Sequence, residues 1–418
     1  MKNEAFSVIK CDDSWSFNDL TRQQTNYASH GYHKYPAKFI PQIVRRLLND
    51  YSEAGDTVLD CFGGCGTTLV ESKLNGRNSI VLDVNEAALL ITKAKKEAID
   101  PYKLGKENEI IVTKLNQIKI KKDYYLMAHP RLKYWFKKKE YNQLAEIYKI
   151  INRVDNSKIK RFYQCCFSNI LKNCSIWYSK SIKPMKDPYK KIANPVQSFL
   201  LHLKFMTKQN MEYYELLKRL NNKPSSEVLE RDARNTGLES NSVDLIVTSP
   251  PYATSYEYAD LHQLTLLWFG FTNDMMKTKR KFIGTSVNSN MNKLTDSQLA
   301  NKIVRSLKNR DKHLAGQINN YYIDMHDTFR EMYRVLRPGR MTCIIIGDTQ
   351  YKNVRIKNME VSKELLESAG FKIKKIIKRK LSSKIFTPYR DKDGKFTDSN
   401  HGKKRKIYQY EYIIVARK

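Results

Sequence analysis

Regular alternation of apolar and polar positions begins at residues 57–90. "TVLD" at 57–60 and "SIVLDVN" at 79–85 predict two strands, and "LVESKLNG" between them predicts a short helix closed by Gly76. A glycine just beyond a helix suits the left-handed position that ends many helices. Strand, turn, helix and strand at this spacing are typical of an α/β sheet with crossover helices.

Apolar runs return near Val228 and continue to the C-terminus. The runs "EVLERDA", "VDLIVTS", "RMTCIIIGD", "FKIKKIIKRK" and "YEYIIVARK" predict five further strands. "YYIDMHDTFREMYRVLRPG" predicts an amphipathic helix ending in a Pro-Gly turn, and "SKELLESAG" a second helix. Together the two stretches predict one doubly wound, Rossmann-like sheet of about seven strands.

The residues between these stretches follow a helical period. Apolar side chains recur at helical spacing in two groups: Leu144, Ile147, Tyr148 and Ile151, then Ile159, Phe162, Cys166 and Ile170. Such spacing predicts helices with one buried face. We therefore expect an inserted, mainly helical subdomain at 101–225, between a first part of the sheet domain at 1–100 and a second at 226–418.

Two polar segments interrupt the second part. Residues 275–316 are basic and rich in Ser and Asn, and predict a mobile excursion from the sheet. Residues 387–406, "TPYRDKDGKFTDSNHGKKRK", predict a solvated hairpin or loop.

The net charge of the chain indicates what kind of molecule it binds. The chain of 418 residues has 75 Lys and Arg against 43 Asp and Glu, a net charge of +32, and the segment 101–225 alone has 27 against 9. A field of that sign attracts polyanions, above all nucleic acid. "RLKYWFKKKEY" mixes lysines with Tyr134, Trp135, Phe136 and Tyr141. This mixture suits a surface that touches phosphates and stacks bases, or equally an aromatic core beneath solvated lysines.

Other features narrow the class of protein. No apolar stretch is long enough to cross a membrane, and the N-terminus lacks the apolar region of a signal peptide. The seven cysteines show no paired CxxC spacing, so we expect free thiols in a reducing cytoplasm and no metal site.

The turn "DCFGGCGTT" is the first candidate binding element. Asp60 ends a strand, three glycines permit a tight backbone with exposed N–H groups, and two threonines can begin a helix. The next strand ends in Asp83, 23 residues after Asp60, where an acid can accept hydrogen bonds from ribose hydroxyls. The pair predicts a cofactor that contains a nucleoside.

"TSPPY" at 248–252 is the second candidate element. Proline has no backbone N–H, so the apolar run "VDLIV" must end there and the chain beyond it is stiff. A stiff segment at the carboxyl end of a strand can hold a planar group in one orientation.

Taken together, these strings resemble the amino-group DNA methyltransferases that use S-adenosylmethionine. "TSPPY" is similar to their catalytic motif in the form typical of cytosine-N4 enzymes, and "HGYHKYPAKFIP" to the stretch that flanks their cofactor. The resemblance implies a class I methyltransferase sheet. It also implies cofactor contacts from Tyr35, Pro36, Phe39, Asp60, Phe62, Gly63, Gly64, Gly66, Thr67, Thr68, Asp83, Asn85 and Asp232. The large insert precedes "LERDARN", so neither familiar order of motifs fits, and the segment that reads bases is open.

The expected chemistry is direct methyl transfer to an exocyclic amine. The lone pair of that amine is delocalised into the ring, so acceptors held against its N–H groups are needed to make it nucleophilic. Ser249 and the carbonyl of Pro250 are the expected acceptors, held by Pro251, while Tyr252 stacks on a base flipped out of the duplex. Thr248, Tyr256 and Tyr258 are the expected substrate contacts.

We therefore expect a site-specific cytosine-N4 methyltransferase acting on double-stranded DNA, in a restriction-modification or related system with a possible cognate endonuclease. Serine in place of a carboxylate at 249 favours cytosine over the alternative, adenine-N6. A DNA-binding specificity subunit without activity, and an RNA methyltransferase, are further alternatives.

Overall fold

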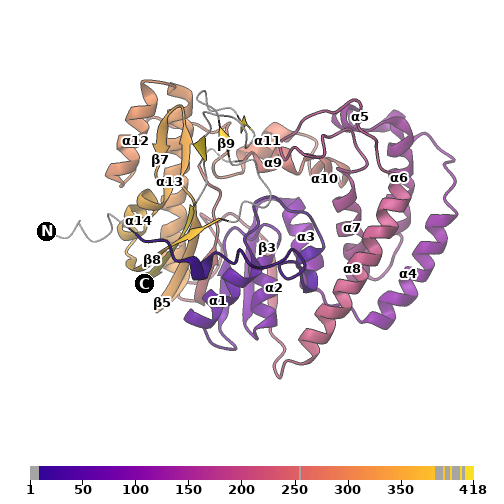
Figure 1. The fold of residues 1–418 in the computed structure, drawn as a ribbon, viewed down its shortest axis with the longest axis horizontal. Coiled ribbons are helices and arrows are strands. Elements are labelled where there is room, and N and C mark those ends of the chain that lie inside the picture. Colours follow the sequence, from indigo (N-terminus) through magenta and orange to yellow (C-terminus); the bar gives the residue numbers. More distant parts are fainter. Residues whose placement is uncertain (1–8, 254–255, 382–388, 391–395, 398–404, 407–409) are drawn as a thin grey trace.

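The computed structural model describes residues 9–253, 256–381, 389–390, 396–397, 405–406 and 410–418. Its main feature is a seven-stranded sheet with the order β3-β2-β1-β4-β5-β12-β8 (Figure 1). These strands are β1 (Thr57–Asp60), β2 (Asn78–Asp83), β3 (Ser226–Glu230), β4 (Val243–Thr248), β5 (Leu336–Ile346), β8 (Lys372–Lys380) and β12 (Tyr410–Arg417). The strands from β3 to β5 pair in parallel, and β12 is antiparallel to β5 and β8. The predicted doubly wound sheet is confirmed.

The described residues also form helices, several of which cover the two faces of this sheet. They are α1 (Pro41–Tyr51), α2 (Thr67–Leu74), α3 (Glu86–Lys96), α4 (Pro101–Asn116), α5 (Pro130–Trp135), α6 (Lys138–Asn152), α7 (Ser157–Ile170), α8 (Pro195–Lys218), α9 (Tyr258–Leu261), α10 (Gln263–Trp268), α11 (Met275–Arg280), α12 (Gln298–Lys308), α13 (Lys312–Val335) and α14 (Asn358–Ser368), with 3-10 helices η1 (Asp13–Trp15), η2 (Ala28–Gly31) and η3 (Tyr124–Met127). Polar residues start many of them: Asp100 and Asn194 each accept a hydrogen bond from the first turn and precede a proline, a strong signal for a helix start.

The two faces of the sheet follow the period of two that a strand imposes. On β1, Val58 packs with α1, whereas the next residue, Leu59, belongs to the core formed with α13 and α14. On β4, Leu245 and Val247 share the first face and Ile246 the second. Alternate apolar residues thus hold helices against both sides of each central strand.

The helices α4 to α8 form the right-hand part of the molecule in Figure 1. The residues expected at helical spacing are buried in α6 and α7, for example Ile147, Phe162 and Cys166. Their core continues into the sheet domain, because Ile91 of α3 and Trp268 of α10 belong to the same cluster. The helical segment is therefore packed into the domain rather than attached beside it.

The structure differs from expectation at 275–316. This segment contains α11 and α12, and α12 buries Ala300, Ile303, Val304 and Leu307 against α13. These apolar residues recur at i, i+3, i+4 and i+7, which marks an amphipathic helix despite the polar composition around them. The expectation of a mobile excursion was therefore wrong for α12.

Other predicted elements can also be checked against the structure. Gly76 follows α2 with φ of 76°, as expected for a helix end. Helix α13 ends at Val335, and Pro338 and Gly339 lie in the first part of β5. Most of 387–406 lies outside the described residues; its described parts form the small sheet β10 (Phe396–Thr397), β9 (Tyr389–Arg390) and β11 (Arg405–Lys406). No helix among the described residues is long and apolar enough to span a bilayer.

Candidate active site

A pocket opens at the carboxyl ends of β1, β2, β3 and β4, where ligands bind in open α/β sheets. It holds about 830 Å³, including space open to solvent. Of the residues selected from the sequence, it is lined by Tyr35, Pro36, Phe39, Phe62, Gly63, Gly64, Thr67, Asp83, Asn85, Asp232, Ser249, Pro251 and Tyr258. The structure therefore brings three distant segments of the chain to one cavity.

The glycines of the turn serve packing rather than an exposed row of N–H groups. A Cβ on Gly63 would lie 1.9 Å from Val81 Cγ1, and a Cβ on Gly66, with φ of 75°, would lie 2.8 Å from Thr92 Cγ2. The N–H of Gly63 donates to Leu82 O, and that of Gly64 to Asp83 Oδ2, both at 2.8 Å. These two N–H groups are therefore engaged within the fold, which corrects the expectation that they face a ligand.

Asp60 lies beneath the pocket and does not line it. Its buried carboxylate accepts hydrogen bonds from Thr68 and Thr248, both at 2.7 Å, and from the N–H of Phe62 at 3.1 Å. Burial raises the pKa of Asp60, and these three donors oppose that shift. Thr248, Thr68 and Gly66 are absent from the lining as well. The expected ligand contacts of Asp60 and Thr248 are corrected to a role in joining β1 to β4.

Asp83 presents its carboxylate at the pocket wall. Its Oδ1 accepts from the N–H of Asn85 and its Oδ2 from that of Gly64, both at 2.8 Å. Burial raises the pKa of Asp83 to about 6, although both hydrogen bonds favour the ionised form. Asn85 Nδ2 donates to His262 Nδ1 at 2.9 Å, and the His262 ring stacks on Tyr35 with centroids 4.7 Å apart. Burial lowers the pKa of His262 to about 4, which keeps the ring neutral and able to accept that bond.

Ser249 lies where β4 enters the pocket. Its hydroxyl donates to Ile345 O of β5 at 3.1 Å. A hydroxyl has one hydrogen and two lone pairs, so this bond leaves the oxygen able to accept. Pro250 is buried and outside the lining, whereas Pro251 faces the pocket. The oxygen of Ser249 is therefore available to an N–H donor in the pocket.

Tyr252 is held from two sides. Its hydroxyl donates to Glu411 of β12, and Glu411 pairs with Arg379, which is buried and donates to Trp15 O at 2.9 Å. Its ring lies against Gly347, where a Cβ would come within 2.8 Å of Tyr252 Cε2. Tyr252 lies outside the pocket lining and is partly buried, packed against the core beneath the sheet. Such anchoring fixes the plane of the ring.

The remaining aromatic candidates are Tyr256 and Tyr258. Tyr258 lines the pocket, and Tyr256 lies outside the lining with its ring 6.2 Å from that of Tyr258. Asp232 lines the pocket while both of its oxygens accept from Arg234, which also pairs with Asp324 at 2.6 Å. Asp232 is thus oriented by an arginine that is itself held by Asp324 of α13.

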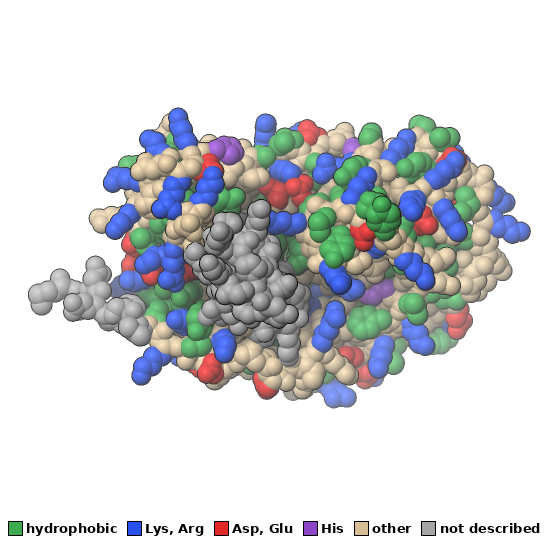
Figure 2. Space-filling view, turned by 45° about the horizontal axis from the view of Figure 1, so that its top comes forward, with side chains coloured by type: hydrophobic (Ala, Val, Ile, Leu, Met, Phe, Trp, Pro, Cys, Tyr) green, Lys and Arg blue, Asp and Glu red, His purple; other side chains and the backbone are tan. Residues whose placement is uncertain are grey.

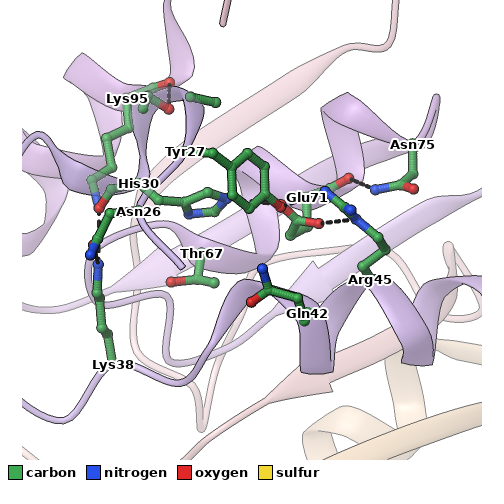
Figure 3. A network of polar contacts seen from close by, with 12 residues as sticks. Asn26, Tyr27, His30, Lys38, Gln42, Arg45, Thr67, Glu71, Asn75 and Lys95 are labelled. Carbon is green, nitrogen blue, oxygen red and sulfur yellow. Dashed lines mark hydrogen bonds and ion pairs between the residues drawn. The ribbon is translucent and has the colours of Figure 1, made fainter. Parts of the chain in front are cut away.

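A buried polar network supports the wall that carries Tyr35 and Phe39 (Figure 3). Glu71 of α2 is fully buried and accepts from Tyr27, from His30 at 2.8 Å and from Arg45 at 3.1 Å. Lys38, at the pocket, donates to Asn26 Oδ1 at 2.8 Å and His30 O at 3.0 Å. The network ties the segment containing residues 26–38 to the helix that follows the glycine turn.

Two buried ammonium groups give this wall a positive character. Burial, followed by the nearby charge of Lys95, lowers the pKa of Lys38 to about 8. Lys95 is itself fully buried, and among the described residues its Nζ has no hydrogen-bond partner. Figure 3 shows both side chains on the same side of the network as Asn26. The wall is therefore suited to an anionic group on a ligand.

Several lining residues were not foreseen from the sequence. They are Lys38, Arg231, Lys281, Phe282 and Ile283, and His262 acts just behind the wall. Lys38 lies inside the quoted "YPAKFIP", and Arg231 inside "LERDARN", so their positions carried a signal. Nothing in the sequence of residues 281–283 indicated a place in the pocket, beyond their position after "TSPPY".

The fold and the pocket are those of an α/β protein with a ligand site at the strand ends of its sheet. Comparisons with known proteins identify the family to which the chain belongs. Residues 4–94 and 243–418 match the N6_N4_Mtase family, described as DNA methylase, and the chain belongs to this family. The chain is 23% identical to the Type II methyltransferase M.MvaI of Kocuria varians over 390 residues, covering 86% of this chain and 85% of that protein. It is 22% identical to the Type II methyltransferase M.BsoBI of Geobacillus stearothermophilus over 419 residues, covering 84% and 80%.

Among solved structures, the rRNA methyltransferase AviRa of Streptomyces viridochromogenes covers 92% of this chain and 88% of its own, with 10% identity and a TM-score of 0.35. That score is too low to bear on the site. The family match leaves out residues 95–242, which include α4 to α8.

The residues of the pocket fit S-adenosylmethionine, a nucleoside joined through sulfur to an amino acid. Asp83 places a carboxylate in the lining, and a carboxylate at such a strand end can accept hydrogen bonds from ribose hydroxyls. Lys38 lines the same pocket, and the buried, unpartnered Nζ of Lys95 near it adds to the positive charge that an amino-acid carboxylate requires.

Proposed function

We propose that this DNA methyltransferase acts on the exocyclic N4 amine of cytosine at a specific site in double-stranded DNA. S-adenosylmethionine is the cofactor, and when bound it supplies an electrophilic methyl group on a sulfonium sulfur. Ser249 carries the proposal, because it lines the pocket and its hydroxyl donates to Ile345 O, which leaves the oxygen able to accept.

The chain's own residues perform the other tasks. Ser249 Oγ accepts an N–H of the target amine, which localises the nitrogen lone pair and aims it at the methyl group. The Pro250 carbonyl is the proposed second acceptor. Pro251 restricts the backbone between Ser249 and Tyr252, and Tyr252, fixed by Glu411, stacks on the extruded base.

Cofactor binding is assigned to residues from three parts of the lining: Asp83, the segment with Tyr35 and Lys38, and Asp232. Asp83, oriented by the N–H groups of Gly64 and Asn85, accepts the ribose hydroxyls. Lys38 pairs with the carboxylate of the amino-acid end, and Asp232 accepts from the adenine amine. Tyr35, held by the stacked ring of His262, packs against the bound cofactor.

Serine at 249 favours cytosine, because adenine-N6 enzymes of the resembled type more often have a carboxylate or amide there. The relatives' designation as Type II methyltransferases supports a restriction-modification setting with a cognate endonuclease. Both remain proposals for this chain.

The test is to express the chain in cells free of other methylases, sequence their DNA by a single-molecule method, and hydrolyse it to nucleosides for mass spectrometry. We expect N4-methylcytosine within one short sequence, and its absence with Ser249→Ala. N6-methyladenine alone would replace cytosine by adenine as the target. Methylated nucleosides found in RNA and never in DNA would refute the DNA substrate. A protein that binds the cofactor and transfers no methyl group would be a specificity subunit.

A further inference from the structure

Two adjacent aliphatic side chains project from the helical segment at η3. Leu126 is 68% exposed and Met127 is 86% exposed. Single exposed apolar residues are ordinary, but two in succession on a short turn leave a continuous apolar tip. Figure 2 shows hydrophobic side chains gathered among lysines and arginines on the face that this view brings forward.

This tip rests on a rigid base. Tyr124 donates to Glu146 of α6 at 2.6 Å, and the N–H of Tyr125 donates to Asn142 at 3.0 Å. From the other side, Lys133 Nζ donates to Leu126 O at 2.8 Å. Side chains and backbone around the tip are therefore fixed, while Leu126 and Met127 themselves stay exposed.

The surroundings of the tip are basic. Exposed lysines precede and follow it in the chain: Lys119, Lys121, Lys122, Lys137, Lys138 and Lys139. Exposed cations on both sides of the tip along the chain suit contact with the phosphates of a duplex; Lys138 among them is paired with Asp123.

The tip is also connected to the pocket. Arg131 of α5 donates to Gln263 of α10 at 2.6 Å and lies 3.9 Å from Asp260 of α9. Asp260 also pairs with Lys279 at 2.7 Å, and Tyr258, two residues before Asp260, lines the pocket. Figure 1 shows α5, α9, α10 and α11 on the same side of the molecule. A run of contacts therefore leads from α5, which holds Leu126 O through Lys133, to the helix that carries Tyr258 at the pocket.

We propose that Leu126 and Met127 form a wedge that enters the base stack of the duplex and fills the space left by the extruded nucleotide. This inference rests on the proposed function, in which the target base leaves the helix. Extrusion costs a few kcal/mol of pairing and stacking. Apolar side chains inserted between bases offset part of that cost, as in other proteins that unstack DNA.

The test uses short duplexes carrying the sequence mapped from DNA of expressing cells. The double variant Leu126→Ala, Met127→Ala removes the wedge, and Leu201→Ala is the matched control, since Leu201 is 72% exposed on α8, a helix outside η3 and α5. Single-turnover methylation is measured at saturating cofactor on a paired duplex and on one with an abasic position opposite the target. Fluorescence of 2-aminopurine placed at the target reports extrusion without methyl transfer.

We expect the double variant to methylate the paired duplex about tenfold more slowly, equivalent to about 1.4 kcal/mol, and to give a weaker 2-aminopurine signal. On the abasic duplex its rate should return to within about twofold of wild type, because no partner base holds the target in the stack. Leu201→Ala should behave as wild type on both duplexes.

An unchanged rate and signal on the paired duplex would overturn the wedge. An equal loss on both duplexes would overturn it as well, since the tip would then act in binding rather than extrusion. If wild-type protein methylates no DNA, the proposed function fails first. Methylation of adenine would correct the base alone, and the comparison of duplexes would still decide on the wedge.

Discussion

Replacing Thr248 by valine tests the role that the structure gives to the buried turn beneath the pocket. The substitution keeps the shape of the side chain and removes the hydrogen bond to Asp60 at 2.7 Å. A hydrogen bond to an ionised group contributes about 1.5–3 kcal/mol, and its loss leaves a buried carboxylate with fewer donors. We therefore expect Thr248→Val to lower the free energy of unfolding by about 1.5–3 kcal/mol.

Thr342 on β5 supplies the matched control. It is as completely buried as Thr248 and lies on the neighbouring strand, yet among the described residues its Oγ1 has no hydrogen-bond partner. Replacing an unpartnered buried hydroxyl by a methyl group is nearly neutral or stabilising. Thr342→Val should therefore change the free energy of unfolding by less than about 0.5 kcal/mol, or raise it.

The assay is urea unfolding at pH 7 followed by circular dichroism, with cofactor affinity measured by calorimetry on the same samples. Comparing the two variants removes contributions common to any Thr→Val change. Equal losses for the two variants, at equal dependence on urea, would refute the assignment of Thr248 as a structural partner of Asp60. A normal stability with abolished cofactor binding would instead restore Thr248 as a ligand contact.

The other predictions concern the pocket and the basic surface. Ser249→Ala should slow methyl transfer about a hundredfold with cofactor affinity unchanged, and calorimetry beside single-turnover kinetics checks both. The pKa of Asp83, raised to about 6, predicts that cofactor affinity falls as the pH drops through 6 and the acceptor becomes protonated; Asp83→Asn should remove this dependence. The pKa of Lys38, lowered to about 8, predicts a second fall as the pH rises through 8, which Lys38→Met should abolish while weakening affinity about tenfold. Replacing Lys137 and Lys139 by glutamine should reduce the slope of log affinity for DNA against log salt by about 2; Lys138 is left unchanged because it pairs with Asp123.

Periodicity was sufficient to predict the sheet because the central strands are buried on both sides. "VDLIVTS" and "RMTCIIIGD" became β4 and β5, and the helix over 321–335 proved to be the second part of α13. The helix α12 has the same kind of period, but the prediction for 275–316 rested on composition, and its four buried apolar residues stand among polar ones. The polar composition of the whole segment 275–316 concealed the helical period of the 11 residues that form α12.

The site was predictable where a motif lies in one segment, and less so where distant segments meet. Asp83 and Ser249, selected from the sequence because each ends or follows a strand, both line the pocket, and their roles stay predictions. Asp60 was misplaced, since a strand-end acid can turn inward as easily as outward. The contacts of Tyr252 with Glu411, and of Asn85 with His262, join residues 159 and 177 positions apart, which no local pattern indicates.

The shared core between the helical segment and the sheet domain limits how this enzyme can be re-engineered. Cys65, from the cofactor turn, belongs to the same cluster as Trp135, Phe167 and Trp268. A chimera that imports the corresponding segment of another methylase must bring matching side chains on α3 and α10. Otherwise the mismatch will loosen the cofactor turn, and the hybrid will lose donor binding before any new sequence preference can be observed.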